Sequence, residues 1–193
     1  MQDEININHL QLLRFRKEGF SKSNILSAFE ERSLQRYLQS GLGKNVFVIS
    51  TPISLDIYYL APEPRQHFVK NGLEVIGIPE AKVRQLIAAG EKQGNEVLTY
   101  FNTVVNALRE HPQLFLKCCK KLSQKFNEDP HPGSLVRLLY SYYDILVERL
   151  LQKNELPHAE KITALRLRPE YNTLAQSNTR SLAKRWLGTL HHN

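Results

Sequence analysis

The sequence predicts a mainly α protein: a compact multi-helix bundle around one buried central helix, with a small two-stranded β element near residues 46–60. Three observations predict this class. Residues 135–153 repeat apolar side chains at helical spacing until little polar surface remains. Most of the remaining chain shows the spacing of amphipathic helices, and alternation with a period of two is confined to residues 46–60.

The central helix is expected to lie inside a bundle and not in a membrane. A membrane span needs roughly 20 residues with few or no charges. Four charged residues interrupt this stretch: Arg137, Asp144, Glu148 and Arg149. Its apolar stripe, against which we expect the other helices to pack, contains Leu135, Leu138, Leu139, Tyr142, Leu146 and Leu150.

The first forty residues are predicted to form three short helices. The first carries Ile7, Leu10 and Leu13 and runs to about Lys17, the second begins near Ser21 or Ser23, and the third stops at Gly41. The β-branched segment 46–50 and the alternation over 53–59 then predict two short strands, as a hairpin or an extended arm packed on the helices.

Helical spacing returns after the proline-containing segment 61–65, which is the best candidate for an internal boundary. A helix is expected to begin at Pro79, to include Val83, Leu86 and Ile87, and to end before Gly90. Further helices are predicted over 97–108, 112–126, 134–153 and 157–166 and in a basic segment near the C-terminus. The length of 193 residues favours a single compact domain over residues 1–193.

Composition bounds the class of partner and the compartment. The net charge is +7. Of this, +5 lies after residue 160, where the sequence contains six basic residues and one acidic residue. A positive field favours nucleic acid, anionic lipid or acidic proteins. The two cysteines, Cys118 and Cys119, are adjacent and poorly placed for a structural disulfide, and the N-terminus does not resemble a signal peptide. We expect a cytoplasmic protein with reduced thiols.

Residues 69–88 resemble a helix-turn-helix unit. Ile76, Gly77 and Ile78 give the hydrophobic–glycine–hydrophobic turn, and a following helix would expose Arg84 and Gln85, with Lys82 beside them. In such a unit the second helix enters the major groove, where arginine and glutamine can read base edges. The alternative is an ordinary packed helix pair with its arginines in solvent.

Residues 19–41 resemble the same unit more weakly. The segment 33–38, which includes Arg36, resembles a recognition helix, but the turn before it contains no glycine. Glu30 and Glu31 would also face phosphates unfavourably.

Two other basic stretches are candidates for contact with phosphates. Lys117, Lys121 and their neighbours form a stripe on one predicted helix, for which the alternative is a solvated helix face. Arg180, Lys184 and Arg185 lie beside Trp186, and that helix suits a membrane surface or, alternatively, packing with Trp186 buried.

The sequence contains no recognisable motif for an enzyme, a metal or a cofactor, and none is expected. We predict a non-enzymatic nucleic-acid-binding protein, DNA-directed, with an accessory or regulatory role in transcription. The alternative is a helical adaptor that binds another protein through its basic C-terminal segment or an apolar patch. The predicted nucleic-acid contacts are Lys82, Arg84, Gln85, Lys117, Lys121, Arg180, Lys184 and Arg185.

Overall fold

The computed structural model describes residues 5–17, 23–84, 86–129, 132–166 and 178–189. The chain divides into two compact units, Met1–Val97 and Leu98–Asn193, called unit 1 and unit 2 below. The segment 61–65, the boundary candidate from sequence, lies within unit 1.

Unit 1 is built on a four-stranded antiparallel sheet with the strand order β2-β3-β1-β4. Its strands are β1 (Leu10–Lys17), β2 (Val46–Ser50), β3 (Leu55–Leu60) and β4 (Leu86–Gln93). Its helices are the 3₁₀ turn η1 (Ile7–His9), α1 (Ala28–Leu42), α2 (Gln66–Val75) and α3 (Glu80–Arg84). The prediction of a small two-stranded β element was therefore wrong in extent, although both predicted strands exist.

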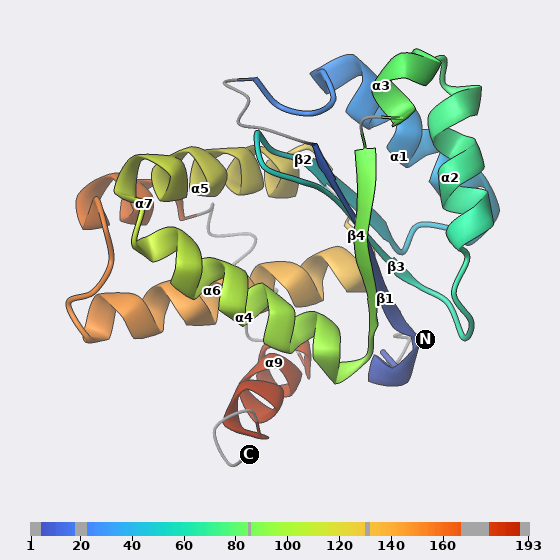
Figure 1. Cartoon of the computed structure of the whole chain (residues 1–193). Coiled ribbons are helices and arrows are strands. Elements are labelled where there is room, and N and C mark those ends of the chain that lie inside the picture. Colours follow the sequence, from blue (N-terminus) through green and yellow to red (C-terminus); the bar gives the residue numbers. More distant parts are fainter. Residues whose placement is uncertain (1–4, 18–22, 85, 130–131, 167–177, 190–193) are drawn as a thin grey trace. The chain divides into compact units, whose positions relative to one another are not determined.

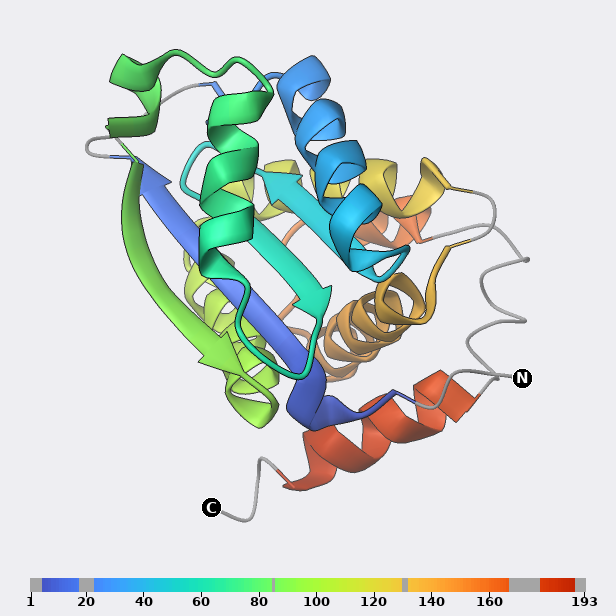
Figure 2. The same cartoon turned by 90° about the vertical axis from the view of Figure 1, so that its right-hand side faces the viewer.

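The topology of unit 1 is that of two interleaved β-α-β units. Strands β1 and β2 run parallel with β3 between them, and β3 and β4 run parallel with β1 between them. This order defines the split β-α-β, or ferredoxin-like, arrangement. Helices α1 and α2 lie side by side and antiparallel on one face of the sheet (Figures 1 and 2).

One predicted helix of unit 1 is a strand, and a second is a strand over its C-terminal part. The first, to Lys17, is β1, where the helical spacing of Ile7, Leu10 and Leu13 was misleading because the strand is apolar at adjacent positions as well. The second, from Pro79 toward Gly90, ends at Arg84, and its remainder is β4. Pairing along β1, with a bulge between Arg14 and Phe15, overrides the helical propensity of β4.

The core of unit 1 lies between the sheet and its helices. Leu13 and Phe15 of β1, spaced by two, pack in one buried cluster with Leu34 and Leu38 of α1 and with residues of α2. The two helices approach closely: a Cβ on Gly72 would lie 2.8 Å from the Tyr37 ring, which stacks on Phe68 at a centroid distance of 5.1 Å. This packing fixes the rotation of α1 and therefore which of its side chains face outward.

The regular structure in the described residues of unit 2 is all helical. Helix α4 (Asn95–Arg109) crosses the boundary after Val97 and is followed by α5 (Pro112–Asn127), α6 (Ser134–Gln152), α7 (Ala159–Leu165) and α9 (Asn178–Thr189). The predicted central helix is present as α6, which is buried along most of its length. Aromatic rings from α4 and α5 pack on it, including Phe101 against Tyr142 and Phe126 against Tyr140.

Candidate nucleic-acid interface

The predicted helix-turn-helix segment does not contain a second helix long enough to enter a groove. Gly77 adopts the left-handed turn conformation with φ 77°, as the motif requires, but α3 has five residues and leads into strand β4. Lys82 Nζ lies 2.9 Å from both carboxylate oxygens of Glu30, and Arg84 pairs with Glu80. Gln85 lies outside the described residues. The two described cations therefore already have carboxylate partners.

The predicted lysine stripe belongs to α5 in unit 2. Lys117 is exposed and Lys121 is half-buried. Lys125, from the same stripe, is buried and its Nζ lies 2.9 Å from Glu128. The lysine stripe is thus exposed at Lys117, half-buried at Lys121 and buried at Lys125.

The basic C-terminal segment is divided between two roles. Helix α9 packs on α6 with Ala183 and Leu187 buried, and Lys184 and Arg185 lie on its exposed side. The helix contains no acidic residue. Arg180 is directed inward, so only the other two predicted contacts of this segment are displayed to solvent.

Arg180 belongs to a cluster of four charged groups in unit 2, which we call the clasp: Asp144 and Glu148 of α6, Arg166 at the end of α7, and Arg180 of α9. Each arginine bridges both carboxylates, with donor–acceptor distances of 2.6–2.8 Å. Asp144 is 1% exposed. Asp144 and Glu148 appear in the sequence only as interruptions of an apolar stripe, because their partners lie 18 to 36 residues away.

The clasp is expected to make unit 2 sensitive to acid. Burial raises the pKa of Glu148, but hydrogen bonds from Arg166 and Arg180 outweigh burial and hold it below its usual value of 4.5. A lowered folded-state pKa contributes stability above the unfolded-state pKa, and this stability disappears as the pH falls through the folded-state value. In thermal melts from about pH 7 to about pH 3, Glu148→Gln should be less stable than the wild type at neutral pH, and the difference should shrink as the pH falls below 4.5, the ordinary pKa of the group. A difference that is constant across this range would contradict this role of Glu148.

The acids of α1, which argued against that helix as a contact for phosphates, are both engaged inside unit 1. Glu30 closes a capping box with Ser27 at the start of the helix and also pairs with Lys82. Glu31 is 1% exposed, and its carboxylate accepts the backbone N–H of Ser50 at 3.1 Å. The described residues 23–42 therefore contain one helix, beginning at Ala28, where the sequence predicted two.

The outward face of α1 carries Phe29, Arg32 and Arg36, which we call the α1 face. The spacing of three and four residues places them on one side of the helix, and all three are exposed. Within the described part of the chain, neither arginine forms an ion pair or hydrogen bond through its side chain. The α1 face therefore displays two positive charges and one aromatic ring without a carboxylate among them.

The α1 face could have been found from the sequence. Ser27 followed three residues later by Glu30 is a capping-box pattern, which places the helix start at residue 28. A helical wheel begun there brings Phe29, Arg32 and Arg36 together. The predicted helix begins too early, near Ser21 or Ser23, because Ile25 and Leu26 extend the apolar pattern toward the N-terminus.

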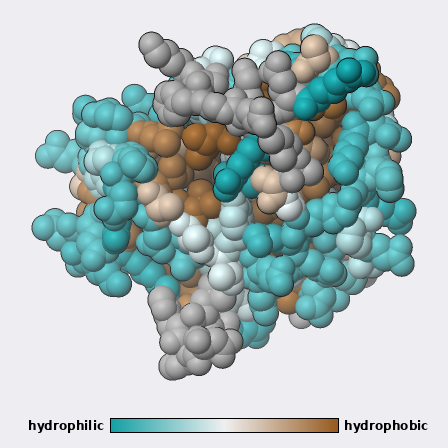
Figure 3. All heavy atoms as spheres, in the orientation of Figure 1, coloured by the Kyte–Doolittle hydropathy of each residue, from teal (hydrophilic) through white to brown (hydrophobic). Residues whose placement is uncertain are grey.

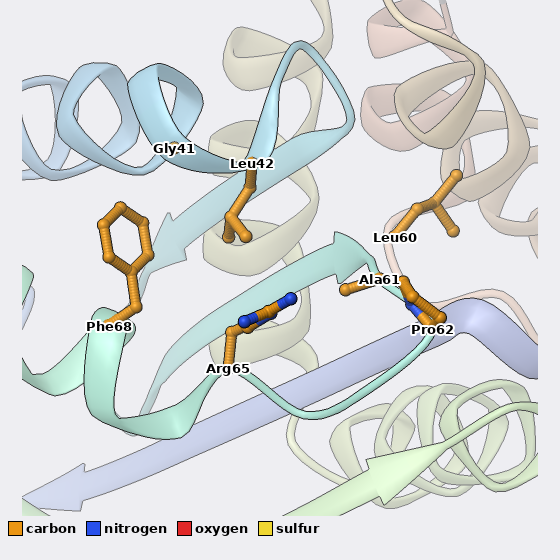
Figure 4. A pocket seen from close by; sticks show the side chains of 7 residues that line it. All are labelled: Gly41, Leu42, Leu60, Ala61, Pro62, Arg65 and Phe68. Carbon is orange, nitrogen blue, oxygen red and sulfur yellow. The ribbon is translucent and has the colours of Figure 1, made fainter.

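Unit 1 also contains a pocket at the C-terminal end of α1 (Figure 4). Its volume is about 410 Å³, and it is lined by Gly41, Leu42, Leu60, Ala61, Pro62, Arg65 and Phe68. Arg65 supplies the only charge of this lining. The pocket contains no pair of groups suited to acid–base or nucleophilic chemistry. Over α2, at the right of Figure 3, the surface is predominantly hydrophilic.

The described residues offer little for catalysis or metal binding. They contain no group of three or more histidine, cysteine, aspartate or glutamate side chains arranged to hold a metal ion. Burial raises the pKa of the Cys119 thiol to about 11, although a hydrogen bond with Tyr143 opposes the shift. This thiol is therefore protonated at neutral pH and is a poor nucleophile.

No helix in the described ranges has the length and apolarity that crossing a bilayer requires. No protein-family model matches the chain, and neither a curated protein nor a solved structure is significantly similar to it.

Proposed function

We propose that this protein binds nucleic acid, without catalysis of its own, and that the α1 face of unit 1 is its principal contact. The observation that carries the proposal is the separation of charge on α1. Both acids of the helix are engaged within unit 1, and both of its arginines project into solvent. The net charge of +7 adds a long-range attraction for a polyanion.

Arginine suits a contact with the nucleic-acid backbone. Its planar guanidinium donates paired hydrogen bonds to phosphate oxygens, and it stays charged at every physiological pH. Arg32 and Arg36 are about 6 Å apart along the helix axis, from the rise of 1.5 Å per residue. Such neighbouring donors can engage successive phosphates of one strand. Since α1 is held on β2 by Glu31 and on α2 by ring stacking, the two donors sit on a rigid element.

The other cations predicted from the sequence take secondary roles in this proposal. Lys184 and Arg185 on α9, and Lys117 and Lys121 on α5, would add non-specific attraction to phosphates. Lys82 and Arg84 would contribute less, because the adjacent carboxylates of Glu30 and Glu80 offset their charges.

The test is fluorescence anisotropy with a labelled oligonucleotide, as a single strand and as a duplex, across a series of salt concentrations. The logarithm of affinity should fall linearly with the logarithm of salt. In the double variant Arg32→Ala/Arg36→Ala the slope should become shallower by about 0.7 for each phosphate that is no longer neutralised on a single strand, or about 0.9 on a duplex.

The matched control is Arg84→Ala, which removes an exposed arginine of the same unit that already has a carboxylate partner. Its affinity should stay within about twofold of the wild type, as expected for a change at an exposed ion pair. Equally weakened binding in the control and the double variant would contradict the placement on the α1 face. Absence of binding at low salt would contradict the function itself and favour the alternative, a helical adaptor for a protein partner.

A further inference from the structure

Phe29 is the most exposed of the large hydrophobic side chains in the described residues, with 73% of its surface accessible. It lies in the first turn of α1, close after the capping Ser27. Exposed apolar side chains that occur singly need no explanation. Phe29 differs because Arg32 follows one turn later on the same side of the helix and Arg36 continues that side.

The ring also has no role in the core that would explain it. The buried cluster of unit 1 draws on Leu34 and Leu38 from the opposite side of α1, and Phe29 is not part of it. Replacing Phe29 should therefore leave the urea midpoint of unfolding close to that of the wild type, as at other exposed sites. An effect on binding can then be separated from an effect on folding.

An exposed aromatic ring beside arginines is the arrangement that holds unpaired bases. Bases of a single strand stack on aromatic side chains while cations follow the backbone, and each stacked base strengthens binding by about 5-fold to about 150-fold. In a duplex the bases already stack on one another, so the ring has no free base face to cover. The ring thus adds affinity only for single-stranded segments.

We infer that the ligand of the α1 face is single-stranded nucleic acid, with a base stacked on Phe29 and its flanking phosphates bound by Arg32 and Arg36. This inference rests on the proposed function and narrows it from nucleic acid in general to unpaired strands. It differs from the groove-reading DNA contact that the sequence predicted, because the recognition element is a ring and not a helix in the major groove.

The test compares Phe29→Ala, Phe29→Leu and Phe29→Trp in the full chain, using one labelled oligonucleotide as a single strand and as a duplex. Phe29→Ala and Phe29→Leu should weaken single-strand binding about tenfold or more, and Phe29→Trp should bind as the wild type does, because only tryptophan keeps an aromatic face. Duplex affinity should change by less than about twofold, and the salt slope should not change, because no charge is removed. Val75→Ala, at a second exposed apolar side chain of unit 1, is the matched control and should have no effect.

The outcomes separate this inference from the proposed function. If Phe29→Leu binds single strands as the wild type does, stacking is excluded. If the wild type prefers the duplex, the inference fails, but nucleic-acid binding that depends on Arg32 and Arg36 would stand. If neither oligonucleotide binds at low salt, both fail.

Discussion

Asp144→Ala is expected to lower the free energy of unfolding of unit 2 by about 3–5 kcal/mol, the range measured when one partner of a buried ion pair is removed. Asp144 is 1% exposed and accepts one hydrogen bond from each arginine of the clasp. Its removal leaves Arg166 and Arg180 largely out of water with one carboxylate between them. The destabilisation should therefore exceed that from removing any exposed ion pair in unit 2.

Urea unfolding followed by tryptophan fluorescence would measure this destabilisation. Trp186 is the only tryptophan of the chain and lies on α9, the helix that Arg180 connects to α6. The control is Glu110→Ala, whose side chain is 70% exposed and pairs with Arg109, and it should change stability by less than about 1 kcal/mol. A cost of under about 1 kcal/mol for Asp144→Ala would show that the clasp does not secure α9.

Tyr142→Ala is expected to destabilise unit 2 by about 3–5 kcal/mol, as for other large aromatic residues truncated in a core. The Tyr142 side chain is fully buried on α6, meets the Phe101 ring edge-on at 5.7 Å and donates a hydrogen bond to the Leu98 carbonyl at 3.1 Å. Truncation would remove the ring that joins α6 to α4. It would leave a cavity in the part of unit 2 that is organised on α6.

Tyr142→Phe separates packing from hydrogen bonding, because it keeps the ring and removes only the hydroxyl. Its expected cost is about 1 kcal/mol. Both variants can be followed through Trp186 fluorescence in urea. Equal costs for the two variants would mean that the hydrogen bond, and not the ring, joins the helices, which contradicts a core organised on α6.

The buried central helix was predictable because its signal is local. An apolar side chain at most positions of 135–153 can be accommodated only by burial, and α6 is buried accordingly. The strands β2 and β3 were predictable for a similar reason, since β-branched residues mark the first segment and a period of two marks the second.

The four-stranded sheet was not predictable because β1 pairs with β3 and β4, which lie far away in the sequence. Strand β4 begins with Leu86 and Ile87, but its other six residues are two alanines, a glycine, a glutamate, a lysine and a glutamine, which do not favour a strand. It becomes a strand by pairing with β1, which lies far earlier in the chain. Such pairing reflects tertiary context, which overrides local propensity.

The candidate site could likewise be predicted only in part. The sequence located the basic helices, but it could not assign each cation to a partner. Arg180 is bound to carboxylates 32 and 36 residues away, and Lys82 is bound to Glu30, 52 residues away. These pairings distinguish Arg32 and Arg36 of α1, which are exposed. The acids beside them in the sequence, Glu30 and Glu31, are bound to other residues of unit 1.

Photo-crosslinking would test directly whether the α1 face is the contact, because it locates the bound strand on the chain. A single strand containing 4-thiothymidine would be irradiated in complex with the full chain, and the crosslinked peptides would be identified by mass spectrometry. We expect crosslinks within residues 28–42 that disappear in the Arg32→Ala/Arg36→Ala variant and persist in Arg84→Ala. Crosslinks confined to residues 112–127 or 178–189, or unaffected by replacing Arg32 and Arg36, would contradict this expectation.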